Sequence, residues 1–148
     1  MSSLKYPILR YNKNNSTFEI NKNEFENTLG NFLGYKKMKK NKTFKNYIII
    51  DYCGNKFEYL DVFFDKINFR LSGILGLLFM NPTISYKYEL KEVGILEAEE
   101  FEIIKNKLLN STKKNSYLIN VGKTSEIYAV IKKSTNIKEL IENMLEYS

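Results

Sequence analysis

Residues 67–90 read INFRLSGILGLLFMNPTISYKYEL. Within them, residues 71–80 form the most apolar run of the chain, and from Ile84 to Leu90 apolar and polar side chains alternate. This period of two is typical of a half-buried strand. Asn81-Pro82 separates the two parts, because proline disfavours helical backbone at the residue before it. We therefore expect residues 71–80 to lie in the core, followed directly by an amphipathic strand.

The length and composition of the chain are those of one globular domain. It has 148 residues, of which 43% are hydrophobic and 27% charged, so we expect residues 1–148 to form a single domain. The apolar run is about half the ~20 residues needed to span a bilayer. No charged start followed by an apolar stretch and a cleavage site is present at the N-terminus. These features predict a cytoplasmic protein without a membrane partner.

The chain has no histidine and a single cysteine, Cys53. Serine and cysteine nucleophiles usually depend on an imidazole base, and most zinc sites need imidazole or several thiolates. Ser-His-Asp and Cys-His catalysis are therefore excluded, and so is an intramolecular disulfide. Enzymatic chemistry would have to use carboxylates, lysine, tyrosine or a magnesium-like ion held by oxygens. We expect neither a cofactor nor a resident metal.

The net charge of +6 comes from one short stretch. Residues 36–45 contain six lysines and no acid, and the remaining chain has 17 basic and 17 acidic residues. These lysines are Lys36, Lys37, Lys39, Lys40, Lys42 and Lys45. The frequent use of lysine, asparagine and isoleucine also indicates an AT-rich gene, which raises the lysine content without a functional demand.

Periodicity and turn signals predict the order ββ-α-ββ-(α)-β-α-ββ-α. Strands are expected over residues 6–11, 17–20, 47–52, 57–64, 84–90, 117–121 and 127–131. Helices are expected over residues 21–33, 97–109 and 136–145, with 71–80 as a fourth that its two glycines weaken. Asn21 with Glu24, and Asn136 with Glu139, are expected to form capping boxes at the starts of the first and last of these helices, and Phe101, Ile104 and Leu108 to form the inward face of the second. Gly94 is expected to mark a break after the strand over 84–90. The lysine-rich residues 36–45 are expected to form a loop. The fold class is α+β, a single domain with a mostly antiparallel sheet of about five to seven strands and three or four helices.

Gly122-Lys123-Thr124 is a partial phosphate-loop motif. A complete loop needs a glycine five residues before Gly122, and position 117 is tyrosine. It also needs a helix afterwards, whereas residues 127–131 are expected to form a strand. We therefore interpret this segment as a polar hairpin turn.

Two aspartates and a Glu-x-Lys triplet give the chain one enzymatic alternative. Glu89 and Lys91 share a face of the expected strand, and Asp61 or Asp65 on the preceding hairpin could join Glu89 around one magnesium ion. Over residues 61–91 this pattern resembles the Asp…Glu-x-Lys site of the restriction-endonuclease-like nucleases, although the Pro-Asp dipeptide is absent. The resemblance implies a magnesium-dependent nuclease with Lys91 near the attacking water. The other interpretation is solvated charge on an exposed strand face.

The lysine stretch offers a second alternative, nucleic-acid binding. With Tyr35, Phe44 and Tyr47 nearby, it could contact a phosphate backbone, and six such contacts would give a log–log salt slope of about −5. No recognition-helix, RRM or KH signature accompanies it. Aromatic residues beside a strand also commonly serve packing.

A small chain without histidine or a complete catalytic constellation favours binding over catalysis. Our leading hypothesis is a non-enzymatic protein that occludes the surface of a protein partner. In composition alone, the chain resembles bacterial immunity and antitoxin proteins, which neutralise a toxin. The candidate contact residues are basic, aromatic or acidic side chains expected at the surface: Lys36, Lys37, Lys39, Lys40, Tyr86, Tyr88, Glu99 and Glu102.

Overall fold

One antiparallel sheet organises the protein, and its strands are arranged in the order β2-β1-β4-β5-β6-β3. The computed structural model describes residues 4–15, 17–22, 27–114 and 124–146. The strands are β1 (Ile8–Asn12), β2 (Phe18–Asn21), β3 (Asn27–Asn31), β4 (Tyr47–Asp51), β5 (Asn55–Ile67) and β6 (Thr83–Ile95). The helices are α1 (Phe32–Asn41), η1 (Thr43–Asn46), α2 (Phe69–Leu78), α3 (Ala98–Lys114), α4 (Thr124–Lys133) and α5 (Ile137–Leu145). The predicted α+β class with an antiparallel sheet is confirmed; the described ranges hold one α-helix more than expected.

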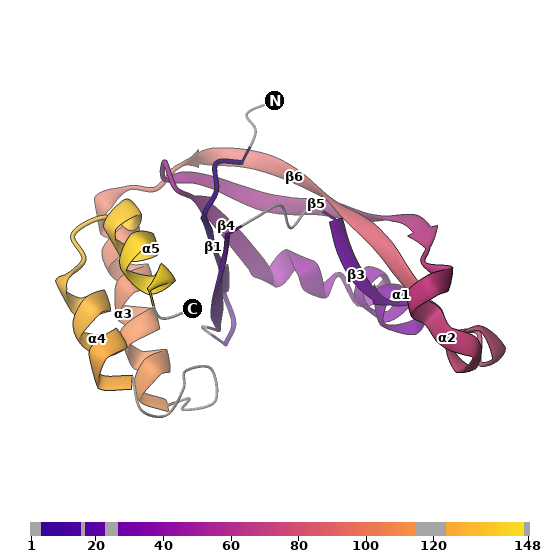
Figure 1. Cartoon of the computed structure of the whole chain (residues 1–148). Helices are drawn as coiled ribbons and strands as arrows, with labels where there is room; N and C mark the ends of the chain where they lie inside the picture. Colours follow the sequence, from indigo (N-terminus) through magenta and orange to yellow (C-terminus); the bar gives the residue numbers. More distant parts are fainter. Residues whose placement is uncertain (1–3, 16, 23–26, 115–123, 147–148) are drawn as a thin grey trace.

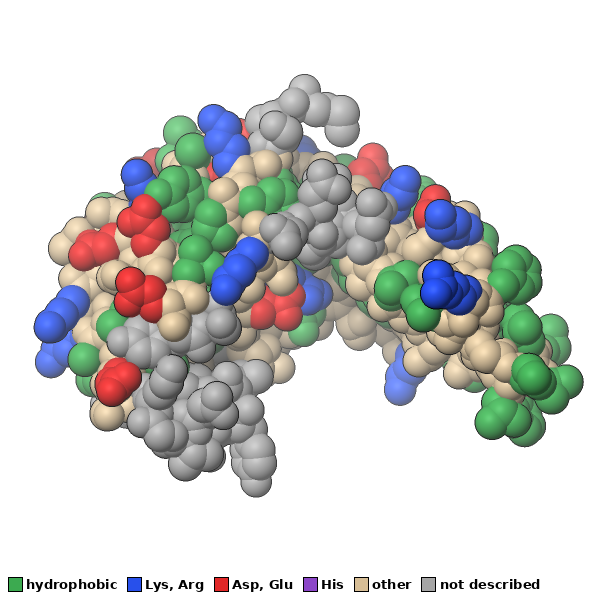
Figure 2. All heavy atoms as spheres, in the orientation of Figure 1, with side chains coloured by type: hydrophobic (Ala, Val, Ile, Leu, Met, Phe, Trp, Pro, Cys, Tyr) green, Lys and Arg blue, Asp and Glu red, His purple; other side chains and the backbone are tan. Residues whose placement is uncertain are grey.

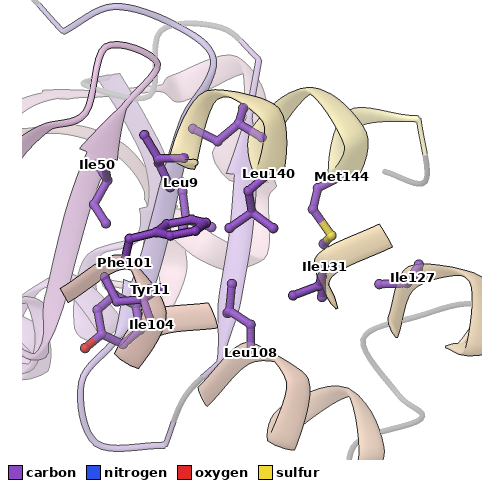
Figure 3. Packing of buried hydrophobic residues seen from close by; sticks show 12 residues of the cluster. Leu9, Tyr11, Ile50, Phe101, Ile104, Leu108, Ile127, Ile131, Leu140 and Met144 are labelled. Carbon is purple, nitrogen blue, oxygen red and sulfur yellow. The ribbon is translucent and has the colours of Figure 1, made fainter. Parts of the chain in front are cut away.

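Helices α3, α4 and α5 cover one face of the sheet at one end of the molecule (Figure 1). Leu9 of β1 and Ile50 of β4 point into this layer, where they meet Leu108 of α3 and Leu140 of α5 (Figure 3). Each of these four side chains is at most 1% exposed. The contacts between this helical layer and strands β1 and β4 form the first core of the protein.

The opposite face of the same strands carries a second core. Successive side chains of a strand point to opposite faces, so Ile8 and Ile49 join this core while their neighbours join the first. Helix α1 and the η1 turn contribute Tyr35 and Phe44 to it. Strands β1 and β4 are therefore buried from both sides.

The expected hairpin over residues 47–64 is confirmed as β4 and β5. Asp51 is fully buried at the turn and accepts hydrogen bonds from the backbone N–H groups of Cys53 and Asn55, each at 2.9 Å. The inward face expected for the strand after residue 83 is also confirmed, since Ile84 is buried and Leu90 is half-buried. β6 continues through Gly94 to Ile95, so the break expected at Gly94 is wrong.

The expected α3 and α5 helices are confirmed with their inward faces. Phe101, Ile104 and Leu108 of α3 are buried. In α5 the Asn136 side chain accepts the Glu139 N–H, as expected for a helix cap. The Glu139 carboxylate returns to the backbone N–H of Thr135 rather than to Asn136, which shifts the reciprocal bond by one residue.

The helix expected over residues 21–33 is wrong where the structure describes it. Residues 27–31 are strand β3, which pairs with β6, and the helix starts only at Phe32. Asn31 provides the cap, because its side chain accepts the Gly34 N–H at 2.7 Å. Five of the six lysines expected in a loop therefore lie on α1 or η1, and Lys42 lies between these two helices. The Glu24 position of the expected cap lies outside the described residues.

Residues 127–131 form part of helix α4, so the expected strand there is wrong. Ile127 and Ile131 are buried four residues apart and face α3 and α5 from one side of a helix. A run of isoleucine, tyrosine and valine favours a strand by propensity, and packing against two helices overrides that preference. The strand expected over 117–121 lies outside the described residues.

The largest correction concerns residues 71–80, which are not in the core. Helix α2 lies at the far end of the β5–β6 hairpin, away from the α3–α5 layer (Figure 1). None of its residues is buried. Across the described ranges, no helix is both long and apolar enough to cross a bilayer.

Candidate protein-binding surface

An apolar knob at the end of the β5–β6 hairpin is the most unusual feature of the surface. We call residues 62–88 the arm and residues 69–80 the arm tip. Large apolar side chains of the tip are 43–79% exposed: Phe69, Leu71, Ile74, Leu75, Leu77, Leu78, Phe79 and Met80. Figure 2 shows hydrophobic side chains gathered at the end of the molecule where α2 lies. Monomers rarely expose apolar patches beyond about 300–600 Å², and larger ones mark interaction sites.

The arm tip is held by hydrogen bonds at its base. Asn68 caps α2 by accepting the Leu71 N–H at 3.2 Å. The Ser72 hydroxyl donates to the Asn68 carbonyl at 2.7 Å and accepts the Thr83 N–H at 2.9 Å, which connects the start of α2 to β6. With its polar groups bonded at the base, the tip projects its apolar side chains outward.

Gly73 bends the tip in the middle. Its φ of 64° and ψ of 170° interrupt the helix, and φ is positive there, which glycine adopts without steric penalty. The chain closes again at Asn81, whose N–H donates to the Gly76 carbonyl at 2.8 Å. The tip is therefore two short helical turns joined at a kink, with apolar side chains on all sides.

Helix α1 begins directly beside the arm tip. The Phe32 N–H donates to the Pro82 carbonyl at 3.0 Å, and the Leu33 N–H donates to the Asn81 side chain at 2.9 Å. Leu33 is 54% exposed and extends the apolar surface. Farther along the helix, the Lys39 ammonium donates to the Val62 carbonyl at 3.0 Å. These contacts fix the lysine-bearing helix against the arm.

The lysines predicted as contact residues lie on this helix and are exposed. Lys36 folds back over the Phe32 ring, with its Nζ atom 5.5 Å from the ring centroid. Lys37 lies one turn after Leu33 and shares its face. The structure therefore places the lysine-bearing helix α1 next to the arm tip.

Tyr86 and Tyr88 of β6 are half-buried and belong to an aromatic cluster. The Tyr86 ring lies 5.6 Å from Tyr35, and the Tyr88 ring 4.8 Å from Tyr59. Burial raises the pKa of the Tyr88 hydroxyl. These two predicted contact residues mainly pack beneath α1, so they support the lysine-bearing helix.

Glu99 and Glu102 lie on α3, at the other end of the molecule from α1 and α2 (Figure 1). Glu102 is 3.6 Å from the Lys105 ammonium. The structure therefore separates the two acidic candidates from the basic ones, and a single small partner face would not contact both groups.

No family model, curated protein or solved structure matches this chain.

The nuclease alternative offered two aspartates to join Glu89, and the structure brings only Asp61 close to it. Asp61 is opposite Glu89 in the β5–β6 register. Asp65 accepts a hydrogen bond from Ser85 at 2.9 Å, four residues along β6 from Glu89, or about 13 Å at the rise of a strand. Lys91 is opposite Glu58. Among the described residues, no group of three or more acidic or cysteine side chains is arranged to hold a metal ion.

The phosphate-loop motif meets one of its two requirements. Thr124 begins helix α4, so the argument that a strand follows the motif is wrong. The tyrosine at position 117 still departs from the phosphate-loop pattern, which has a glycine there. Gly122 and Lys123 lie outside the described residues.

Sequence reasoning missed the arm tip as a contact surface, although it identified the segment. An apolar run predicts burial but does not say what covers it. The available signal was its composition, because Gly73 and Gly76 are poor residues for a core helix and Arg70 lies within it.

Proposed function

We propose that this protein is a non-enzymatic binding protein that acts by covering the surface of another protein. The observation that carries the proposal is the exposed arm tip, where eight large apolar side chains are presented on a segment joined to the sheet by hydrogen bonds. Leaving them in water is unfavourable, and burying one such side chain contributes about 1.5–3 kcal/mol. A partner that covers the tip would gain this free energy without any chemical step.

The most concrete form of the proposal is an immunity- or antitoxin-like protein that neutralises a bacterial toxin. Such a protein needs a well-held complementary surface and no catalytic group. The two packed cores supply a firm support, and the arm, whose base residues Val62 and Ile84 belong to the second core, presents the surface beyond them. The identity of the bound partner would define the biological role of the protein.

Co-expression with the product of the adjacent reading frame tests the proposal. We expect a defined complex that buries roughly 1,600 Å². Ile74→Ser combined with Leu78→Ser should weaken it by at least about tenfold, since two buried aliphatic side chains contribute more than 1.4 kcal/mol together. Both residues are at least 70% exposed, so the variant should fold normally.

Ile103→Ser is the matched control, because Ile103 is 56% exposed on α3 and lies far from the tip. The affinity of this variant for the neighbouring product should stay within about twofold of that of the original protein. If the neighbouring product does not bind, the proposed function fails. If it binds equally well to the double variant, the arm tip is not the working surface.

A further inference from the structure

The arm and its adjoining helix carry an uneven share of the charge. Residues 27–50 and 62–88 together contain nine basic side chains and one acid, Asp65. Asp65 already has a basic neighbour, with the Lys87 ammonium 3.8 Å away. The rest of the chain holds 14 basic and 16 acidic residues. The positive charge is therefore concentrated on the arm and on the α1–η1 segment that adjoins it.

We propose that the partner of the arm tip is a protein with an apolar groove bordered by acidic side chains. This inference rests on the proposed function and names the chemistry of its partner. The groove would accept α2, and its acidic border would meet Lys36, Lys37 and Arg70. These three residues are exposed and form no ion pair with a carboxylate of the described chain. They can therefore pair with charges from outside.

A groove is required because of the shape of the tip. Exposed side chains occur on both sides of the Gly73 kink and along both helical turns. A flat surface would cover one side of such a segment and leave the other in water. A concave apolar site covers it from several sides, as when a helix binds in a groove.

A second copy of this chain fits the tip poorly. A symmetric dimer brings the same patch of both molecules together. Each arm with its adjoining α1–η1 segment carries nine basic side chains against one acid, and bringing two such regions together is electrostatically unfavourable. The charge distribution favours a different, acidic partner.

A lipid bilayer also fits less well than a protein groove. The backbone is non-helical at Gly73, and departures from regular helix are unfavourable in hydrocarbon because every backbone polar group there needs a partner. Residues 66–82 contain no tyrosine or tryptophan, the residues that anchor proteins at the membrane interface. A nucleic acid would pair with the lysines but would leave the aliphatic side chains of the tip uncovered.

Charge reversal on α1 tests the acidic border, with the adjacent reading-frame product as the probe. Lys36→Glu together with Lys37→Glu should weaken the complex by at least about tenfold, because two attractive contacts become repulsive. The affinity of the original protein should also fall as salt rises from about 0.05 M to about 0.5 M, which shortens the Debye length several-fold.

Lys132→Glu together with Lys133→Glu is the matched control. Both lysines are exposed in the last turn of α4, and the variant has the same net charge as the α1 variant. Its affinity should stay within about twofold of the original. An equal loss in both variants would mean that only the overall charge matters, and the acidic border would be rejected.

The outcomes separate the two proposals. If the probe does not bind the original protein, the proposed function itself fails. If binding needs the apolar tip but is insensitive to salt and to charge reversal on α1, protein binding stands and the acidic border is wrong. Sedimentation with phosphatidylcholine–phosphatidylserine vesicles, a shift of duplex DNA, or reversible dimerisation, each abolished by Ile74→Ser with Leu78→Ser, would instead identify a different occupant and overturn this inference.

Discussion

At the scale of single residues, Asp51 determines how β4 turns into β5. Its carboxylate is fully buried and accepts the N–H groups of Cys53 and Asn55, together with the Asn55 side-chain amide at 3.0 Å. Gly54, between these donors, adopts a positive φ of 85°, which glycine tolerates best. A buried carboxylate is stable only when such donors surround it.

Replacing this carboxylate should therefore destabilise the whole fold. We expect Asp51→Ala to lower the free energy of unfolding by about 3 kcal/mol, because a hydrogen bond to a charged group contributes about 1.5–3 kcal/mol and several are lost. The stability of the Asp51→Asn variant, which keeps one acceptor oxygen, should lie between those of the original protein and Asp51→Ala. Urea denaturation measures both, with Glu89→Ala on the exposed face of β6 as a control that should change stability by less than about 0.5 kcal/mol.

A second residue, Glu100, makes stability depend on pH. Its carboxylate lies 2.6 Å from the Lys56 ammonium, and this hydrogen bond lowers the pKa of Glu100 below its ordinary value. Because the unfolded chain then binds more protons, the stabilisation is fully present above the ordinary glutamate pKa and is lost as pH falls through the lowered one. The side chain is 45% exposed, so solvent screening limits the effect to less than about 1 kcal/mol.

Glu100→Gln should therefore flatten part of the acid limb of the stability curve. Urea midpoints measured from neutral pH down to about pH 3 will show this. The variant should be slightly less stable than the original at neutral pH, and the two should converge at the acid end. A constant difference at every pH would mean that the Lys56 contact contributes nothing through charge.

At the scale of elements, the structure separates apolar segments that hold the fold from one that does not. Leu108 of α3 is fully buried against the sheet and α5, whereas Ile74 of α2 is 77% exposed. We expect Leu108→Ala to cost about 3–5 kcal/mol, including the cavity that it leaves. Ile74→Ser should change stability by less than about 0.5 kcal/mol. Thermal and urea unfolding compare them directly, and a large loss in the Ile74 variant would show that the tip is packed.

The elements also show where sequence reasoning succeeds. Ile84 to Leu90, Phe101 to Leu108 and the Asn136 cap were predicted correctly, because local periodicity and capping chemistry decide them. The same rules placed a strand at α4, since propensity within residues 127–131 favours one and only contact with α3 and α5 reverses it. The candidate surface was predicted in part. Its lysines were identified, but the exposed arm tip beside them was not.

The missing neighbour was the arm tip, and the reason is physical. The apolar run of residues 71–80 has the same composition whether a core or a partner covers it. Its position depends on the length of β5 and β6, which extend for 13 residues each and carry α2 beyond both cores. That length depends on pairing between distant residues, which a local pattern does not contain.

At the scale of the whole molecule, hydrogen exchange should divide the protein into a stable centre and a labile arm tip. Ile8, Leu9, Ile49 and Ile50 are at most 1% exposed because β1 and β4 lie between two cores, so their amides should exchange only through global unfolding. The α2 amides contact few buried groups and should exchange much faster, through local opening.

Binding of the partner should change this division at one place. Amides of α2 and of the first turn of α1 should exchange at least about tenfold more slowly in the complex, because a groove that covers α2 stabilises its hydrogen-bonded state. Amides of α5, at the other end of the molecule, should change only through the overall gain in stability. If the α2 amides of the free protein already exchange as slowly as those of β4, then another molecule of the same chain covers α2 in solution. A dilution series would then restore fast exchange as that contact dissociates.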